Sequence, residues 1–423
     1  MLKVSHIIDN KNDVINALSK RNFDAKEIII DLENFNSERK KIQSDLEDVL
    51  AQLNKISKEI GELMKSGNND EANKLKGQTL KLKESSKKLN NNLNSIKLKI
   101  DDLLYKIPNI PNESVPFGNS EDDNEEVFKS GDVPSLESSA LAHWELAKKY
   151  DIIDFDLGNK ITGSGFPVYK GMGAKLQRAL ISFFLDINTE AGYNEVQVPY
   201  LVNQESGIGT GQLPDKDDQM YHIQADNLYL IPTAEVPLTN IYRDVILNKK
   251  ELPQLLTAFS PCFRREAGSY GSNVRGLNRL HQFDKVEILR IEDPNNSHDA
   301  LKDMVEHVKS ILNKLKLPYR VLKLCGSDLG FTSSLTYDFE VYSAAQKRWL
   351  EVSSVSNFES YQSNRLKLRY RNDDGKIQLA HTLNGSALAL PRIFASIIEN
   401  YQTAKGIVIP DILVPYTGFS IIN

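Results

Sequence analysis

The sequence contains few cysteines and no long apolar run. Only Cys262 and Cys325 occur among the 423 residues, and no CxxC pair is present. Two cysteines cannot form a disulfide framework, and the lack of a CxxC pair argues against a structural zinc site. Nowhere do 18 apolar residues follow one another, and Asn, Asp or Lys interrupts every apolar run near the start. We therefore expect a cytoplasmic chain with no secretion signal and no membrane span.

The common glycine-rich nucleotide cradles are also missing. No GxxxxGK[ST] loop is present, and no GxGxxG segment opens a helix after a strand. Any bound phosphate must therefore be held by cationic side chains. The 52 Lys and Arg residues against 57 Asp and Glu give a formal net charge of −5. A nucleic acid would consequently have to bind at a local basic patch, because the whole chain offers no attraction to a polyanion.

The most regular pattern lies between Ile28 and Leu103. Apolar residues recur at alternating steps of four and three in two stretches, which the turn-forming sequence SGNND at 66–70 separates. This pattern predicts two antiparallel helices that project on the order of 50 Å. The first seam is Ile28, Leu32, Phe35, Arg39, Ile42, Leu46, Val49, Leu53, Ile56, Ile60 and Leu63, with Arg39 as its one polar member. The second is Ala72, Leu75, Thr79, Leu82, Ser86, Leu89, Leu93, Ile96, Ile100 and Leu103.

The second helix is basic. Between Asp70 and Lys99 it carries eight lysines against Asp70, Glu71 and Glu84, a net charge of +5, whereas the first helix has an acidic excess. The lysines are equally compatible with a solvated outer face of a coiled coil and with a stripe that binds phosphates.

A change of composition separates this hairpin from the rest of the chain. Residues 111–135 are rich in Pro, Asn, Gly and acidic side chains, which is typical of a linker. Beyond residue 136, helical stretches alternate with short strand patterns, and we predict an α+β body with an antiparallel sheet flanked by helices. The expected strands are 194–198, 227–231, 256–264, 280–291, 319–324, 336–342 and 348–354.

The segment from Ala258 to Ile288 gathers charged and aromatic side chains. It is predicted to form a strand, a polar loop and a returning strand. On regular strands Arg264 and Glu266 would share one face, as would His281, Phe283 and Glu287 on the partner strand, because side chains alternate with a period of two. One face of the sheet would then hold a guanidinium, two carboxylates and an aromatic ring. Ordinary cross-strand ion pairs on an exposed sheet would give the same pattern, so it does not identify a site by itself.

Several motifs resemble one known family. FRREAG at 263–268 with RGLNRLHQFDKVE at 275–287 is similar to motif 2 of the class II aminoacyl-tRNA synthetases in their seryl form. GYNEVQVPYLV at 192–202 resembles motif 1, and TLNGSALALPRIFASIIENYQ at 382–402 resembles motif 3. TAEVPLTN at 233–240, GTGQLP at 209–214 and EVSSVSNFESYQSNR at 351–365 resemble further signatures of seryl enzymes. The chain is identified as a member of the bacterial-type seryl-tRNA synthetase family.

The resemblance implies ATP-dependent activation of L-serine and transfer to tRNA. It implies that Arg264 bridges the serine carboxylate and the α-phosphate, and that Arg392 contacts the γ-phosphate. Both are the expected catalytic residues, since fixed guanidinium groups offset the repulsion between two anions. The remaining residues implied to bind ATP are Arg265, Glu266 at the adenine amino group, Phe283 stacked on the adenine, Glu351, Val352, Ser353 and Ser354.

The resemblance also implies a serine pocket and a Mg²⁺ site. The pocket would consist of Thr233, Ala234, Glu235, Arg264, Glu287 and Ser386. Glu351 and Ser354 would hold Mg²⁺, which takes hard oxygen ligands. Residues three apart on a regular strand face opposite ways, so we expect a bulge or a strand end near Ser353. His281 is expected to have a structural or positioning role and not to act as a general base.

The resemblance further implies how the chain is organised. Residues 1–110 would form a tRNA-binding domain whose coiled-coil arm, at about 28–103, grips tRNA(Ser) and also tRNA(Sec) where that tRNA is charged. Residues 136–423 would form the catalytic domain of a homodimer with motif 1 at its interface. Arg265, where the family more often has serine, and Ser327, where it more often has glycine, depart from the pattern and affect only loop conformation.

Three other interpretations remain at this point. A synthetase-like ligase that loads a carrier protein would share the activation chemistry but lack the long arm. A catalytically dead homologue that binds RNA as a dimer would lack Arg264, Glu351 or Arg392, and all three are present. A coiled-coil scaffold would explain 28–103 but none of the later motifs.

Overall fold

The fold divides into two compact units. A computed structural model of the chain describes residues 1–215, 218–266 and 275–423. One unit contains Leu2–Ser19 and Phe23–Pro108, and the other contains Met1, Lys20–Asn22 and Asn109–Asn423. We call them the helical unit and the body.

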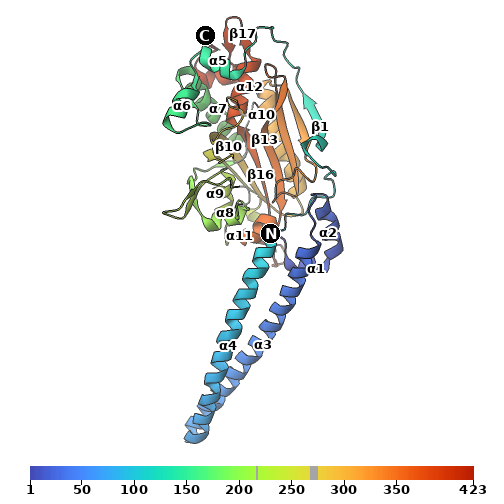
Figure 1. The fold of residues 1–423 in the computed structure, drawn as a ribbon, viewed down its shortest axis with the longest axis vertical. Helices are drawn as coiled ribbons and strands as arrows, with labels where there is room; N and C mark the ends of the chain where they lie inside the picture. Colours follow the sequence, from blue (N-terminus) through green and yellow to red (C-terminus); the bar gives the residue numbers. More distant parts are fainter. Residues whose placement is uncertain (216–217, 267–274) are drawn as a thin grey trace. The chain divides into compact units, whose positions relative to one another are not determined.

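The helical unit contains the predicted hairpin. Short helices α1 (Val4–Asp9) and α2 (Lys11–Ser19) precede the long helices α3 (Lys26–Lys65) and α4 (Asn69–Leu104), which pack against each other (Figure 1). Along most of both long helices the seam residues are less exposed than the residues beside them; Leu32, Ala72, Leu93, Ile96 and Ile100 are buried. The heptad pattern therefore predicted the hairpin and most of its contact face. At the start of α3 and the end of α4 the pattern is less exact, because Ile29, Asn36 and Leu104 are more buried than the seam residues next to them.

Arg39, the polar member of the first seam, is bonded within its own helix. Its guanidinium donates to Asn36 Oδ1 at 3.1 and 3.2 Å and to Gln43 Oε1 at 2.9 Å. The charge is thus satisfied by neighbours three and four residues away, which is the spacing at which side chains of one helix meet.

The body is built around an eight-stranded sheet. The strand order is β1–β11–β12–β13–β16–β10–β9–β4, and neighbouring strands are antiparallel except for β4 and β9. The strands are β1 (Glu125–Ser130), β4 (Asn194–Glu195), β9 (Gln254–Phe263), β10 (Gln282–Glu292), β11 (Tyr319–Lys323), β12 (Leu335–Ser343), β13 (Arg348–Glu359) and β16 (His381–Ala389). This arrangement confirms the predicted α+β class with an antiparallel sheet.

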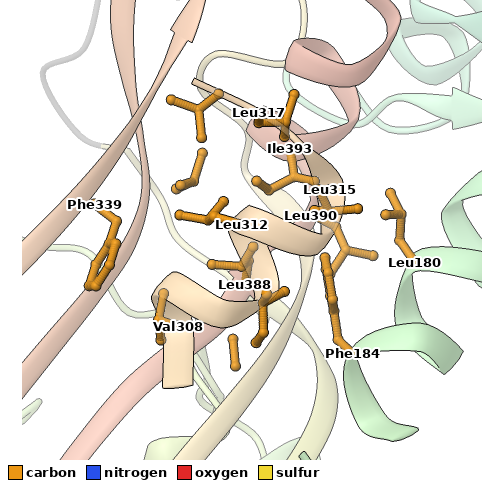
Figure 2. Close-up of a cluster of buried hydrophobic side chains, with 14 of the residues drawn as sticks. Leu180, Phe184, Val308, Leu312, Leu315, Leu317, Phe339, Leu388, Leu390 and Ile393 are labelled. Atoms are coloured by element: carbon orange, nitrogen blue, oxygen red, sulfur yellow. The ribbon is translucent and has the colours of Figure 1, made fainter. Parts of the chain in front are cut away.

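The main hydrophobic core lies between this sheet and the helices α7 (Gly171–Glu190), α10 (Ser297–Leu315) and α12 (Leu390–Asn400). Figure 2 shows Leu180 and Phe184 of α7 near Leu312 and Leu315 of α10, beside Ile393 of α12. All of these side chains are buried, so the sheet is anchored on this face and its other face is available for a site.

Smaller elements complete the body. The helices are α5 (His143–Lys149), α6 (Phe155–Ile161), α8 (Gln204–Thr210), α9 (Glu235–Asn240), α11 (Tyr361–Leu366) and α13 (Val414–Thr417), with 3-10 turns η1 (Glu121–Asp123), η2 (Lys249–Glu251) and η4 (Asp411–Leu413). The strands are β2 (Ile153–Asp154), β3 (Val168–Tyr169), β5 (Leu201–Asn203), β6 (His222–Ile223), β7 (Leu228–Leu230), β8 (Ile246–Asn248), β14 (Arg369–Arg371), β15 (Ile377–Leu379), β17 (Gln402–Thr403), β18 (Gly406–Val408) and β19 (Ile421–Ile422). Within the described ranges, no helix is long and apolar enough to cross a membrane.

Besides the short strands of the small sheets, most of which were not predicted, the structure differs from the expectation at β16, β7 and β1. β16 was not predicted, although it lies between β13 and β10 in the middle of the sheet. The expected strand at 227–231 forms β7 in a separate sheet with β5 and β6. The segment at 111–135, predicted as a linker, contains β1, which is an edge strand with mostly exposed side chains. An exposed edge strand does not need alternating apolar residues, because neither face of it is buried in a core. The polar sequence of β1 therefore resembles that of a linker.

Candidate active site

A cavity of about 1030 Å³ lies against the sheet face opposite the main core. β10 shows how the sequence creates two chemically different faces. Val286 and Ile288 belong to the core, whereas Phe283, Lys285 and Glu287 line the cavity. Alternation along a strand thus places a ring, an ammonium and a carboxylate side by side in the cavity, as predicted for Phe283 and Glu287.

Two buried carboxylates form one end of the cavity. Glu287 is bonded to Lys285 Nζ at 2.7 Å, to Asn384 Nδ2 at 3.0 Å and to Thr233 Oγ1 at 3.3 Å. Glu235, at the start of α9, accepts a hydrogen bond from Gln362 Nε2 at 2.6 Å. Burial raises the pKa of both carboxyls, and the charge of Glu287 contributes to the value of about 7 for Glu235. The charges of Lys285 and Arg264 offset this rise only in part, so the pocket favours a further cation.

Arg264 and Glu266 reach the cavity by a route that differs from the expectation. β9 ends at Phe263, and Glu266 has a left-handed φ of +49°, so strand alternation does not position these two residues. Both nevertheless line the cavity. The Arg264 guanidinium lies 5.2 Å from the centre of the Phe283 ring, and its Nε donates to Pro232 O at 3.4 Å. Glu266 forms an ion pair with Arg279.

Arg392 enters the cavity from the first turn of α12. Pro391 occupies a first-turn position, where its missing N–H costs no helical hydrogen bond. Arg392 Nε donates to Asn278 O at 3.1 Å, and Nη1 donates to Glu351 O at 2.8 Å. These two carbonyls fix the plane of the guanidinium at the cavity wall.

The expected bulge in β13 is present. Phe339 of β12 pairs with Ser353 and Glu340 pairs with Glu351, so Val352 is an extra residue in the ladder. Glu351 and Ser354 therefore line the same cavity. Asp338 pairs with Ser354 across the strands, and its buried Oδ1 has no hydrogen-bond partner among the described residues.

Twelve of the predicted site residues line this cavity, and two do not. Those that do are Thr233, Glu235, Arg264, Glu266, Phe283, Glu287, Glu351, Val352, Ser353, Ser354, Ser386 and Arg392. Ala234 is fully buried in the small core beneath α9. Arg265 lines a separate cavity of about 450 Å³ and lies 3.2 Å from Asp218, because the chain turns after β9 and sends consecutive side chains apart.

His281 lies just before β10 and lines a neighbouring cavity of about 860 Å³. Its ring is stacked on Phe166 with centroids 5.5 Å apart, and Nδ1 is 2.8 Å from the Tyr221 hydroxyl. These contacts support the expected structural or positioning role.

Comparisons with known proteins agree with the motifs. Residues 1–111 match the family model of the seryl-tRNA synthetase N-terminal domain, and residues 220–401 match the tRNA synthetase class II core domain (G, H, P, S and T). A serine–tRNA ligase of Pseudothermotoga lettingae is 42% identical over 425 aligned positions that cover 100% of both chains. The chain belongs to the seryl-tRNA synthetase family. A serine–tRNA ligase of Salinibacter ruber is 51% identical over 363 residues, 85% of each chain.

A solved structure supports the family assignment. The seryl-tRNA synthetase of Pyrococcus horikoshii, crystallised in complex with ATP, has a TM-score of 0.90 and 32% identity. The match covers 100% of this chain and 99% of that one. The helical hairpin and the synthetase sheet are therefore both features shared with a seryl-tRNA synthetase.

Four residues in the cavity or beside it were missed in the sequence. Lys285 could have been predicted, because it is two residues from both Phe283 and Glu287 and so points to the same face of β10. Asp338 is likewise two residues from Glu340 in β12, and both residues line the cavity. Gln362 and Asn384 lie within motifs that resemble the family, but residue spacing gives neither a signal of its own, since each contacts a carboxylate more than 90 residues away.

Proposed function

We propose that this chain activates L-serine with ATP to form seryl-adenylate and then transfers the seryl group to tRNA. The observation that carries the proposal is that one cavity combines two buried carboxylates, Glu235 and Glu287, with the guanidinium groups of Arg264 and Arg392. Such a cavity suits an amino acid whose ammonium and carboxylate are bound at opposite ends, next to a polyphosphate. Family membership supports the same reaction, since the relatives described above are serine–tRNA ligases.

The carboxylate end would hold the serine ammonium and hydroxyl. Glu235 and Glu287 provide negative charge, while Thr233, Asn384 and Ser386 provide neutral hydrogen-bonding groups at the same end. Buried groups of this kind reject an amino acid that leaves them unpaired. Ala234 would act only indirectly, because it lies between Thr233 and Glu235 in the chain but is itself buried in the small core and does not line the cavity.

The cationic end would hold ATP. Arg264 is assigned to the serine carboxylate and the α-phosphate, and Arg392 to the γ-phosphate. Phe283 is assigned to the adenine ring and Glu266 to its amino group, with Val352 and Ser353 of β13 forming the wall. The guanidinium of Arg264 lies 5.2 Å from the centre of the Phe283 ring, so it would have to move off this face for adenine to stack there. The role of Arg265 in ATP binding would require its side chain to leave Asp218.

The residues of the β13 bulge fit a Mg²⁺ ion. Glu351 and Ser354 are hard oxygen donors on one wall. Beside them lies Asp338 Oδ1, which has no hydrogen-bond partner in the part of the chain that the structure describes. Within the described part of the chain, no three His, Cys, Asp or Glu side chains converge to hold a metal by themselves. Mg²⁺ typically takes one or two carboxylates together with water and substrate phosphates, and when bound it neutralises phosphate charge.

The first step would be attack by a serine carboxylate oxygen on the α-phosphorus of ATP, with pyrophosphate leaving. In the second step, the terminal ribose hydroxyl of tRNA attacks the seryl carbonyl, and AMP leaves. The protein contributes orientation and fixed positive charge, because Arg264 and Arg392 meet the charge that develops at phosphorus. No side-chain nucleophile is required.

We assign the remaining parts on the same basis. Residues 1–110 form the tRNA-binding domain, in which the arm at 28–103 binds tRNA(Ser), and tRNA(Sec) where it is a substrate. Residues 111–135 connect this domain to the catalytic domain at 136–423. All eight lysines of α4 between residues 70 and 99 have exposed side chains, as phosphate binding requires. A homodimer that uses motif 1, at 192–202, and a cytoplasmic location complete the proposal.

The test is ATP–pyrophosphate exchange with each amino acid in turn, for the intact chain and for Arg264→Ala. Serine should support the fastest exchange, and the variant should lose at least about a hundredfold, because a charged hydrogen-bond donor to the transition state is removed. Exchange led by another amino acid would overturn the serine assignment. A chain inactive with every amino acid would be a catalytically dead homologue, and one that exchanges with serine but charges no tRNA would favour a carrier-protein ligase.

A further inference from the structure

We infer that His143 is a positioning residue that orients Arg392 through the turn at 275–278. The inference rests on the proposed role of Arg392 at the phosphates of ATP. His143 is the first residue of α5 and touches neither the sheet cavity nor any residue assigned to a substrate. Its effect would reach the active site through hydrogen bonds.

The contacts of His143 determine its tautomer. The side chain is fully buried, and Nε2 accepts a hydrogen bond from the backbone N–H of Leu277 at 2.8 Å. A nitrogen that accepts cannot carry a proton, so the hydrogen is on Nδ1, which lies 2.7 Å from Glu399 Oε1. His143 therefore accepts at Nε2 and donates at Nδ1, and it links a backbone amide to a buried carboxylate.

The turn is fitted closely to the imidazole. Gly276 has a φ of +69°, and a Cβ added to it would lie 2.2 Å from His143 Nε2. Both the backbone conformation and the short approach exclude other residues there. Contact with the imidazole ring thus fixes how closely this turn can approach α5.

The same turn holds Arg392. The carbonyl of Asn278, one residue beyond Leu277, accepts from Arg392 Nε at 3.1 Å. A shift of the Leu277 amide would move this carbonyl. The guanidinium would then be held only through Nη1, which donates to Glu351 O at 2.8 Å and lies 3.6 Å from Glu351 Oε2. A planar guanidinium held at one point can rotate, whereas two points give it one orientation.

A second path returns from the turn to α12. Gln346 Oε1 accepts from Asn278 Nδ2 at 3.1 Å, and Gln346 Nε2 donates to Glu399 Oε1 at 2.9 Å. Glu399 also accepts from the backbone N–H of His143 at 2.8 Å and from the Ser343 hydroxyl. Glu399 and Arg392 belong to the same helix, about two turns apart. The bonds therefore close a ring that ties the turn to the helix that presents Arg392.

The two nitrogens of His143 can be tested separately. His143→Gln keeps an acceptor near the position of Nε2, and His143→Asn keeps a donor near the position of Nδ1. In serine-dependent ATP–pyrophosphate exchange, His143→Asn should raise KM for ATP or lower kcat by about tenfold, since one orienting hydrogen bond is removed. KM for serine should stay within about twofold, and His143→Gln should recover most of the activity.

A double-mutant cycle separates positioning from general stability. If His143 acts through Arg392, His143→Asn should cost little in an Arg392→Ala background, because residues that act as a unit are not additive. Full additivity, an equal loss of affinity for serine, or equal activity of the Asn and Gln variants would overturn the inference. If Arg392→Ala itself leaves exchange unchanged, the proposed role of Arg392 fails instead.

Gln346→Met provides the measurement should His143→Asn not fold, as judged by circular dichroism. Gln346 is only half-buried, so the fold should tolerate its replacement. The variant loses the hydrogen bond that Asn278 Nδ2 donates to Gln346 Oε1. We expect KM for ATP to rise severalfold with KM for serine unchanged. An unchanged KM for ATP in this variant would contradict the inference.

Discussion

At the scale of single residues, the cavity is unusual because it keeps two carboxylates away from water. Glu235 has a pKa of about 7 against an ordinary value of 4.5, first because of burial and then because of Glu287. The folded chain therefore binds more protons than the unfolded chain between these two values. This carboxyl consequently lowers the stability of the fold as the pH rises from 4.5 to 7, a cost that an ammonium ligand would offset.

The pH dependence of kcat/KM for serine should show the protonation of Glu235. Protonation removes the charge that attracts the ammonium, so kcat/KM for serine should fall by up to about tenfold per pH unit below about pH 7. Glu235→Gln should have low activity without this acidic limb, whereas Glu340→Gln should keep it. Measuring exchange between about pH 5.5 and 8.5 decides the matter, and a limb that survives in Glu235→Gln would belong to another group such as Glu287.

At the scale of elements, one extra residue in β13 determines what the strand can hold. The bulge at Val352 brings Glu351 and Ser354 to the same cavity, which a regular strand would not do. Bulges commonly redirect side chains at functional sites. The geometry of the assigned Mg²⁺ site thus depends on the register of the β12–β13 pair.

Replacing Glu351 should alter the Mg²⁺ requirement. Glu351→Gln removes the charged donor, so the Mg²⁺ concentration for half-maximal exchange should rise by about tenfold or more. Glu340→Gln is the control, because Glu340 lines the same cavity but is paired with Arg320 at 2.5 Å. Mn²⁺ paramagnetic resonance in the presence of ATP gives a readout that does not depend on turnover. If both variants depended equally on the Mg²⁺ concentration, Glu351 would not be a Mg²⁺ ligand.

The helix α4 carries the residues assigned to tRNA binding. Changing Lys83, Lys87 and Lys88 to Gln should weaken tRNA binding and reduce the slope of log K against log salt by about 0.7 to 0.9 for each phosphate that is no longer neutralised. The matched control changes Lys40, Lys41 and Lys55 to Gln on α3, where acidic residues predominate. Serine-dependent exchange should be unchanged in both sets. If the control variant bound tRNA as weakly as the α4 variant does, the lysines would act only through the overall charge.

At the scale of the whole molecule, the two units should perform separable parts of the reaction. Replacing residues 47–88 with a short glycine-rich turn removes nearly equal lengths of α3 and α4. Exchange should continue within about twofold, because the cavity is lined by the body alone. Charging of tRNA should fall by about a hundredfold or more, since six of the eight α4 lysines assigned to tRNA phosphates are removed. Undiminished charging would show that the arm does not bind the substrate tRNA.

Much of this protein is determined by local sequence. The hairpin was predictable because its heptad period is a property of consecutive residues, and Phe283 and Glu287 were predictable because strand parity depends only on spacing. The motif resemblance identified the family, which the comparisons confirmed. β1 and β16 were missed, since an edge strand and a strand that continues into a helix lack the usual alternating pattern.

Only the tertiary structure decided how distant residues meet. Leu277 and His143 are 134 positions apart, and Gln362 and Glu235 are 127 apart, so no local pattern connects them. The raised pKa of Glu235 and the separation of Arg265 from the cavity also arise from packing. The physical reason is that periodicity records which face a side chain takes on its own element, whereas burial, desolvation and hydrogen-bond partners depend on which elements are brought against that face.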